Sequence, residues 1–291
     1  MQGVENIVAR VVEHVRRENI TRAINIWNRT IGLKICVIGD PIIDIYHMAH
    51  AGRVSHDGPL VNCIQQLEHC YAGGRDIVAK VLSDCGATVT VTEVDKPYVK
   101  KHRLVCDKVK VARWTEPTLY KRLKDKYLYT GYEAYIVSSF GLGTVVGGFL
   151  DVEKHVGQAP VFVDCQNPLE IPGWSQNQCT LFATKQEWTM AYPLINPEVK
   201  AFKEVIQKDG PSGCRIGIDK DRMEAFNLNP VDTTGSGDCF LAVASMMLTI
   251  DDKDAYSACF VASIAAAIKC MSMGNVSVTR EQIDHVIRRT L

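Results

Sequence analysis

The sequence predicts a layered α/β fold in which helices cover a mostly parallel central sheet. From residue 76 onward, helical patterns alternate with short strand-like apolar runs, the order expected of parallel strands joined by crossover helices. The chain has 291 residues, of which 46% are hydrophobic and 23% charged, a profile that excludes disorder, collagen and coiled coil. Because no linker, repeat or low-complexity tract divides the chain, we expect residues 1–291 to form a single domain.

The N-terminal part predicts a helix followed by a buried strand. Apolar residues recur at spacings of three and four between residues 4 and 28, with charges between them, which predicts an amphipathic helical extension over residues 1–30. Residues 34–40 (KICVIGD) are an apolar run that ends in Gly-Asp. This pattern is typical of a buried parallel strand whose carboxyl end opens onto a ligand site.

Residues 46–72 differ from the rest of the chain. Gly52, Gly58 and Pro59 punctuate segments of weak alternation without a helical period, which predicts short strands outside the main sheet. We interpret them as a β lid inserted in the domain. The remaining pattern predicts helices over residues 76–85, 145–157, 198–208, 238–249 and 253–271, and strands over residues 89–91, 134–137, 161–163 and 180–182.

Charge and cysteine content limit the possible classes of function. Lys plus Arg and Asp plus Glu both number 33, so no global basic field points to nucleic acid or an anionic membrane as partner. The 11 scattered cysteines include no C-x-x-C pair, which indicates reduced thiols in a cytoplasmic protein. The sequence shows neither a signal-peptide pattern nor an apolar run long enough to span a membrane.

The most specific functional signal is residues 229–238 (NPVDTTGSGD), which lead directly into an apolar helix. A glycine-rich turn at a helix start places the N–H groups of Gly235, Ser236 and Gly237 at the positive helix end, where they can cradle an anion. Asp238 follows this cradle and can accept a proton from an incoming hydroxyl. A base beside an anion cradle suits phosphoryl transfer, although a lone Gly-x-Gly-Asp is also a common helix cap.

Residues 232–238 (DTTGSGD) resemble the D-T-x-G-[AS]-G-D signature of the ribokinase-like, PfkB-type carbohydrate kinases. Within that family the likeness is closest to the bacterial heptose-7-phosphate kinases, the kinase half of the bifunctional enzyme of ADP-heptose synthesis. Weaker resemblances follow in the family's order at residues 39–44, 52–59, 73–74, 208–213, 258–267 and 273–275. The resemblance implies a three-layer α/β/α sandwich with a small β lid, ATP and Mg²⁺ as cofactors, and a sugar or sugar phosphate as acceptor.

The resemblance also implies roles for individual residues. Asp238 is the implied catalytic base, beside the cradle of Gly235, Ser236 and Gly237. The implied acceptor-binding residues are Asp40, Asp44, Gly73, Gly74, Arg53 and Arg103. The implied nucleotide-binding residues are Thr234, Lys208, Gly210, Gly213, Ala266 and Asn275, and Glu187 is implied to organise Mg²⁺ through water.

Some of these residues have a second interpretation. Asp40 and Asp44 end a buried strand, where a desolvated carboxylate needs partners, so each could instead make a structural hydrogen bond. Arg53 could be a solvated charge of the lid, and Arg103 could lie on an exposed strand face. Glu187 could be a carboxylate that stabilises a helix N-terminus.

The chain departs from the family pattern mainly on the acceptor side. Ile77 stands where the family has an asparagine that touches the sugar, and Ser139 and Leu142 replace an acid and a lysine of the heptose kinases. Because a lysine commonly holds a substrate phosphate, its loss weakens the case for a phosphorylated sugar. Thr184 replaces the asparagine of the family's metal-organising N-x-x-E motif.

These departures leave three functions open. The first is an ATP-dependent sugar kinase, and the second is a kinase-fold protein that binds nucleotide or sugar with little turnover. The third is a kinase for a nucleoside or another alcohol, with Tyr46, Tyr71 and Phe140 as candidate stacking residues. Because lid strands expose edges that must be covered, we also expect a homodimer that pairs two lids.

Overall fold

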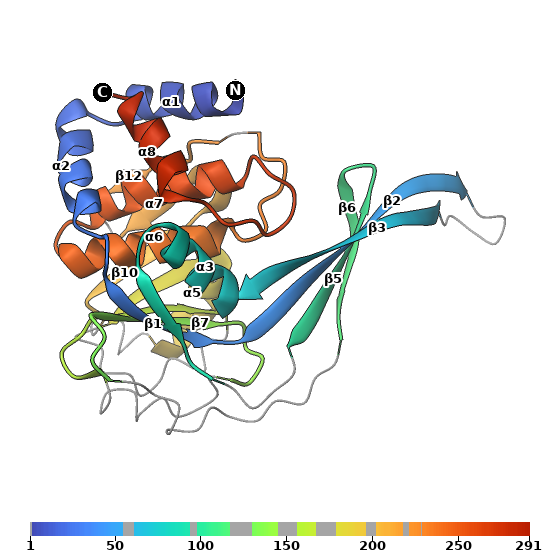
Figure 1. The fold of residues 1–291 in the computed structure, drawn as a ribbon, viewed down its shortest axis with the longest axis horizontal. Coiled ribbons are helices and arrows are strands. Elements are labelled where there is room, and N and C mark those ends of the chain that lie inside the picture. The colour runs from blue at the N-terminus through green and yellow to red at the C-terminus, as the bar shows by residue number, and fades with distance from the viewer. Residues whose placement is uncertain are drawn as a thin grey trace.

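The computed structural model describes residues 2–54, 61–93, 98–116, 130–144, 156–166, 179–195, 202–217, 221–227 and 229–291. Two sheets organise these residues. An eight-stranded sheet lies inside the body of the molecule, and a four-stranded sheet projects from the body as an arm (Figure 1). In the described part of the chain, no helix combines the length and the apolar character needed to cross a membrane.

The eight-stranded sheet has the order β12-β11-β10-β9-β8-β7-β1-β4. Its strands are β1 (Lys34–Gly39), β4 (Thr88–Val91), β7 (Ala134–Ser139), β8 (Val161–Cys165), β9 (Cys179–Thr184), β10 (Glu204–Lys208), β11 (Cys214–Ile216) and β12 (Arg222–Met223). The strands from β4 to β10 in this order are parallel, whereas β11 and β12 pair antiparallel. The carboxyl ends of the parallel strands therefore meet at one edge of the sheet, where ligands bind in such folds.

Helices cover both faces of this sheet. They are α1 (Gln2–His14), α2 (Arg17–Asn28), α3 (Arg75–Asp84), α5 (Lys185–Ile195), α6 (Ser236–Ile250), α7 (Ala255–Lys269) and α8 (Arg280–Arg288). Alternate residues of a strand point to opposite faces, and β1 shows this division. Ile35 and Val37 join the larger core cluster with α1, α2, α3, α6, α7 and α8, whereas Cys36 and Ile38 join a second cluster against which Trp188 of α5 packs.

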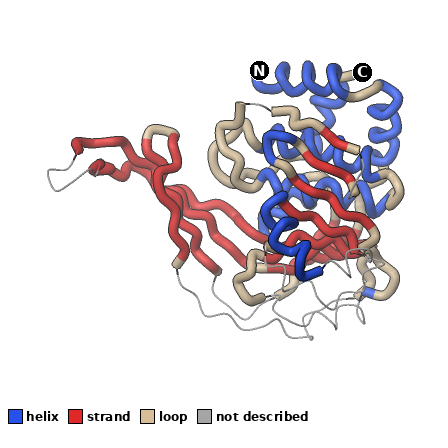
Figure 2. Tube along the Cα trace, turned by 180° about the vertical axis from the view of Figure 1, so that it is seen from behind, coloured by secondary structure: helices blue, strands red, loops and turns tan. Residues whose placement is uncertain are grey.

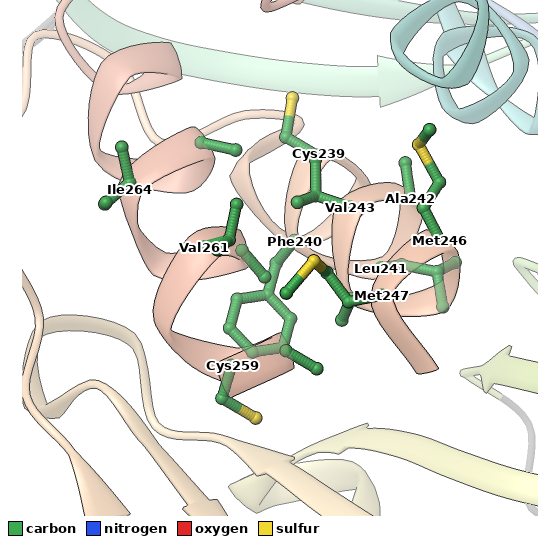
Figure 3. Packing of buried hydrophobic residues seen from close by; sticks show 14 of the residues in the cluster. Cys239, Phe240, Leu241, Ala242, Val243, Met246, Met247, Cys259, Val261 and Ile264 are labelled. Atoms are coloured by element: carbon green, nitrogen blue, oxygen red, sulfur yellow. The ribbon is translucent and has the colours of Figure 1, made fainter. Parts of the chain in front are cut away.

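Helix α6 is buried over most of its length. All of its residues from 239 to 248 are buried, which is expected of a helix that is apolar on every side. Figure 3 shows Phe240 and Met247 of α6 packed beside Val261 of α7. Phe240 also contacts Phe182 of β9, with ring centroids 6.2 Å apart. Because the core holds α6 on all sides, its N-terminus is a rigid support for the glycine-rich turn.

The four-stranded sheet has the order β3-β2-β5-β6 and forms the arm seen in Figures 1 and 2. Its strands are β2 (Pro41–Val54), β3 (Val61–Gly74), β5 (Val99–Cys106) and β6 (Val109–Thr115). Strand β2 follows β1 after Asp40, and it pairs antiparallel with β3 and parallel with β5. We call this sheet the lid, because its base lies beside the carboxyl edge of the main sheet.

The structure confirms most predicted elements. The strands predicted over residues 34–40, 89–91, 134–137, 161–163 and 180–182 are β1, β4, β7, β8 and β9, and the helices predicted over residues 76–85, 238–249 and 253–271 are α3, α6 and α7. The lid predicted over residues 46–72 is larger, because β2 also pairs with β5. The helix predicted over residues 145–157 lies almost entirely outside the described residues.

Two predictions about helices are wrong. The single helix expected over residues 4–28 is two helices, because the backbone is extended at Arg16, with φ −67° and ψ 142°. The helix expected over residues 198–208 is replaced, within the described residues, by strand β10, whose Val205 and Ile206 are buried. A short apolar run does not distinguish a buried strand from a buried helix by periodicity alone.

Candidate active site

The glycine-rich turn before α6 requires glycine at its centre. Gly235 has a φ of 80° and immediately precedes the helix. A Cβ atom at this position would lie 1.8 Å from Asn275 Oδ1. Both the left-handed backbone and the close approach of Asn275 therefore exclude a side chain here.

The first turn of α6 has backbone N–H groups without a helical partner, the kind of group that binds an anion at a helix N-terminus. Gly237 and Asp238 lie in this turn, where N–H groups have no helical carbonyl partner and the helix end is positive. Ser236 behaves differently, since its N–H donates to the Thr233 carbonyl at 3.1 Å and its hydroxyl donates to the same oxygen at 2.9 Å. The expectation that the Ser236 N–H faces the anion is therefore wrong, because this residue closes the turn.

Asp238 lines a cavity of about 200 Å³ at the carboxyl edge of the main sheet, together with Phe140, Asp164 and Lys208. Burial and the charges of nearby carboxylates, Asp164 foremost, raise the pKa of Asp238 to about 7, although Lys208 opposes this rise. A carboxyl with this pKa exchanges a proton readily near neutral pH, which is the property required of a general base.

Lys208 ends strand β10 and forms a short ion pair with Asp164 of β8. Its ammonium lies 3.5 Å from the position that a Cβ of Gly237 would occupy, so it stands against the anion cradle. Burial disfavours the ammonium, but the charges of Asp164, Glu187 and Asp238 outweigh this effect and raise the pKa of Lys208. A charged lysine beside backbone N–H groups is an ordinary arrangement for binding phosphate.

A second cavity, of about 370 Å³, adjoins the cradle on the side of α7. Its lining includes Lys208, Gly210, Gly213 and Ala266, four of the six residues predicted to bind nucleotide. Gly213 has a φ of 84°, and a Cβ there would lie 1.9 Å from a backbone oxygen of β12. This turn therefore needs glycine to close the end of the cavity. The cavity has the mixed apolar and polar lining expected for a nucleotide base and ribose.

Asn275 does not line this cavity and lies beside Asp44 at the base of the lid. Its side-chain amide donates to Asp44 Oδ2 at 3.0 Å, while Asp44 Oδ1 accepts a short hydrogen bond from Arg103 of β5. A Cβ at Gly73 would lie 2.6 Å from Asp44 Oδ2, so Gly73 makes room for this carboxylate. The structure thus brings the predicted residues Asp44, Gly73 and Arg103 together at the base of the lid. Gly74 begins α3 beside them, with a φ of 55°. The side chain of Arg53 lies outside the described residues.

Asp40 has a structural role in this geometry. Its carboxylate is fully buried and accepts hydrogen bonds from the N–H groups of Phe140 at 2.7 Å and Thr144 at 3.2 Å. It therefore holds the loop that carries Phe140 into the Asp238 cavity. The expectation that Asp40 grips the acceptor is not supported, because both of its oxygens are occupied by this loop.

Two lysines of the lid, Lys101 and Lys110, also lie near the site, although the sequence did not predict them. Lys110 of β6 forms a short ion pair with Asp232, and its ammonium lies 2.5 Å from Thr234 Oγ1. The charges of Asp44 and Asp238 raise the pKa of Lys101, but burial outweighs them and lowers it. The Lys101 ammonium lies 4.4 Å from the centroid of the Phe140 ring. No local signal marks Lys110, because all seven residues of β6 are exposed and the strand reads as a solvated surface.

Glu187 takes part in a helix cap. Its Oε2 atom accepts from the Thr184 N–H at 2.7 Å, and its own N–H donates to the Thr184 hydroxyl at 3.2 Å, a reciprocal pattern that starts α5. Thr184 thus replaces asparagine without loss of the local turn. Glu187 also lines the Asp238 cavity with Asp164 and Gln166. These oxygen donors suit Mg²⁺, but the described residues contain no group of three His, Cys, Asp or Glu side chains able to hold a metal alone.

The other residues singled out in the sequence lie in the core or beside the Asp238 cavity and Asp232. Ile77 is 1% exposed and belongs to the main core, so it does not touch an acceptor. Ser139 lines the Asp238 cavity. Tyr46 is fully buried and donates to Asp232 Oδ2 at 3.0 Å, and Tyr71 packs edge-on against it with ring centroids 5.2 Å apart.

No protein-family model and no curated protein sequence matches this chain. Solved structures do match its fold. The ribokinase of Arabidopsis thaliana, complexed with ribose and ATP, is 14% identical with a TM-score of 0.61, and the match covers 89% of this chain and 99% of that one. Phosphofructokinase-2 of Escherichia coli is 10% identical, with a TM-score of 0.67 and coverages of 89% and 99%.

A nucleoside kinase of Burkholderia thailandensis, in complex with inosine, is 14% identical with a TM-score of 0.61, over 87% of this chain and 97% of that one. These likenesses extend over nearly the whole of each chain. The protein therefore has the ribokinase-like fold, a three-layer α/β structure with a small lid sheet, and the proteins that it resembles in structure are kinases.

Proposed function

We propose that the protein transfers the γ-phosphoryl group of ATP to a hydroxyl of a sugar or sugar phosphate. The observation that supports this most directly is Asp238, a carboxyl with a pKa of about 7 in the first turn of a buried helix, beside an anion cradle. The cradle separates a nucleotide-sized cavity from the cavity at Asp238. Donor and acceptor can therefore meet over one set of N–H groups.

The residues divide the work of phosphoryl transfer as follows. Asp238 takes the proton of the acceptor hydroxyl, and the N–H groups of Gly237 and its neighbours stabilise charge on the transferred group. Lys208 adds a positive charge on the nucleotide side. Asp44 orients the acceptor hydroxyls, while Arg103 and Asn275 fix the Asp44 carboxylate. The lid holds the acceptor and excludes water.

Mg²⁺ would be held largely by the nucleotide phosphates, with Glu187 acting through water. When bound, it would neutralise charge on the phosphates during transfer. The reciprocal cap with Thr184 uses only Oε2 of the Glu187 carboxylate, which leaves this residue compatible with that role.

We propose further that the acceptor carries an anionic group, as a heptose 7-phosphate does. Leu142 stands where the heptose kinases have a lysine, but the lid supplies two other cations: the charge of Lys101 acts on Asp238, and Arg103 pairs with Asp44. The Lys101 ammonium covers the Phe140 ring at 4.4 Å, a favourable cation–π contact. A nucleoside base would have to displace this ammonium to stack on Phe140, so the arrangement favours a sugar phosphate over a nucleoside.

We also propose that two chains pair through their lids. Large apolar side chains are exposed on the outer lid strands: Ile64 and Leu67 on β3, and Val109, Val111 and Trp114 on β6, with exposed fractions of 47–64%. Exposed apolar side chains on the two edge strands of the lid favour a partner that covers these edges. Sedimentation at micromolar concentration should give a dimer, and Leu67→Glu should shift it to monomer. A monomeric wild-type chain would contradict the pairing.

The function is tested by ADP release from Mg-ATP in the presence of heptose 7-phosphate, other sugar phosphates, free sugars and nucleosides. The proposal predicts acceptor-dependent release, with a lower KM for phosphorylated sugars than for the corresponding free sugars. Turnover with nucleosides alone would contradict this proposal and indicate a nucleoside kinase. Binding of ATP without turnover on any acceptor would favour a binding protein.

A further inference from the structure

Within the described ranges, Lys269 is the least exposed lysine, with 1% of its surface exposed. It is the last residue of α7, and it lines neither the nucleotide-sized cavity nor the Asp238 cavity. Burying an ammonium is costly unless it is well coordinated. A lysine in this position therefore requires an explanation that the proposed chemistry does not supply.

The ammonium of Lys269 donates to two backbone carbonyls. They are Asp232 O at 2.9 Å and Ser272 O at 3.3 Å. The first belongs to the segment that leads into the cradle, and the second to the loop after α7. Burial lowers the pKa of Lys269, and the nearby Asp232 carboxylate opposes this shift. The coordination by carbonyl oxygens resembles that of a bound monovalent cation.

The two segments joined by Lys269 build the site together. On the other side of Asp232, its carboxylate accepts from the Gly274 N–H at 3.0 Å. The next residue, Asn275, packs against Gly235 and donates to Asp44. The loop after α7 thus reaches both the cradle and the acceptor side. Besides the link through the Cys270 carbonyl, which accepts from the Val231 N–H at 2.7 Å, its position relative to Asp232 is set by the link from Gly274 to the Asp232 carboxylate and by the link through Lys269.

We propose that the Lys269 ammonium serves as a resident monovalent cation, which holds the carbonyls of Asp232 and Ser272 and so fixes the loop of residues 271–275 against the anion cradle. Lys269 is a positioning residue, because it acts on the cradle only through these carbonyls. If the charge is removed, the two oxygens are left facing a space that a free cation of ammonium size can enter. The inference rests on the proposed function for its nucleotide-binding readout but not for its stability readout.

The test compares full-length wild type, Lys269→Met and the surface control Lys80→Met, whose lysine side chain is 57% exposed. Thermal unfolding and ATP affinity are measured in potassium, ammonium and tetramethylammonium chloride at equal ionic strength. Tetramethylammonium is too large and has no N–H donor, so it controls for screening alone. Wild type and Lys80→Met should behave alike in all three salts.

Lys269→Met should unfold at a lower temperature and bind ATP about tenfold more weakly in tetramethylammonium, equivalent to about 1.4 kcal/mol. Potassium or ammonium should restore both properties in a saturable manner, which a loss of packing alone would not allow. A variant that responds equally to all three salts would overturn the proposal. A wild-type protein that needs potassium or ammonium for its stability or its ATP affinity would also overturn the proposal. This measurement on wild type tests the proposal even if Lys269→Met does not fold. If wild type shows no kinase activity, the unfolding series still tests Lys269 separately.

Discussion

Replacing Asp238 with asparagine should make the protein more stable at alkaline pH. The pKa of this carboxyl is about 7 in the folded protein, against an ordinary value of 3.8. Between these values the folded chain holds a proton that the unfolded chain releases. The free energy of unfolding contributed by the group therefore decreases as the pH rises from 3.8 to about 7. Asparagine has the same shape and remains neutral, so it avoids this loss.

The size of the effect follows from the two pKa values. Proton linkage between 3.8 and about 7 predicts that the stability advantage of Asp238→Asn over wild type grows by about 2.5 kcal/mol between pH 5 and pH 8. For a chain of this length that corresponds to roughly 5 °C in Tm. Because the comparison is between two pH values, any constant effect of the amide cancels.

The assay is thermal or urea unfolding of both proteins at pH 5 and pH 8. Asp252→Asn is the matched control. The Asp252 side chain is 46% exposed, and its hydrogen bond to Lys203 holds its pKa below the ordinary range. It is ionised in both states from pH 5 to pH 8, so its variant should show a constant offset. An equal offset for Asp238→Asn at both pH values would refute the raised pKa and with it the reasoning about the base.

Three further substitutions test other parts of the site. Gly235→Ala should lower the free energy of unfolding, measured in urea, by about 1–3 kcal/mol more than Gly32→Ala does. Both glycines have φ near 80°, but only Gly235 faces a side chain, that of Asn275. Equal losses would show that Asn275 does not exclude a side chain at position 235. Lys101→Met should raise the KM for a phosphorylated acceptor about tenfold in steady-state kinetics, equivalent to ~1.4 kcal/mol. The KM for free sugars should rise less, and the KM for ATP should not change. An equal rise for phosphorylated and free sugars would contradict an anionic acceptor. Lys110→Met should lower kcat/KM by about tenfold, again ~1.4 kcal/mol. The substitution removes the ammonium that joins the lid to Asp232 and Thr234. An unchanged kcat/KM would show that the contacts of Lys110 do not hold the lid.

The local pattern of the sequence was sufficient to predict five strands of the main sheet (β1, β4, β7, β8 and β9) and the glycine-rich turn before α6. Strands such as β1 are short, apolar and bounded by turn residues, and the glycine-rich turn before α6 needs glycine at position 235. The strand β10 was misread because its five residues carry no periodicity that separates strand from helix. Its misassignment did not hide Lys208, which the motif had already marked.

The acceptor side was less predictable because it depends on contacts across the chain. Lys110 and Asp232 are 122 positions apart, and Asn275 and Asp44 are 231 apart. Asp40 was expected to bind the acceptor, but its partners are backbone N–H groups, which leave no trace in the residue types of the loop. Lys269 sits in an alanine-rich apolar helix, where its coordination by two carbonyls could be recognised only in three dimensions.

The most direct test of the central claim is to measure ATP affinity and acceptor-dependent ADP release for wild type and Asp238→Asn side by side. If Asp238 is the base beside a separate nucleotide cradle, the variant should bind ATP as tightly as wild type while its kcat falls by about 10²–10⁴-fold. Turnover by the variant at the wild-type rate would contradict the account.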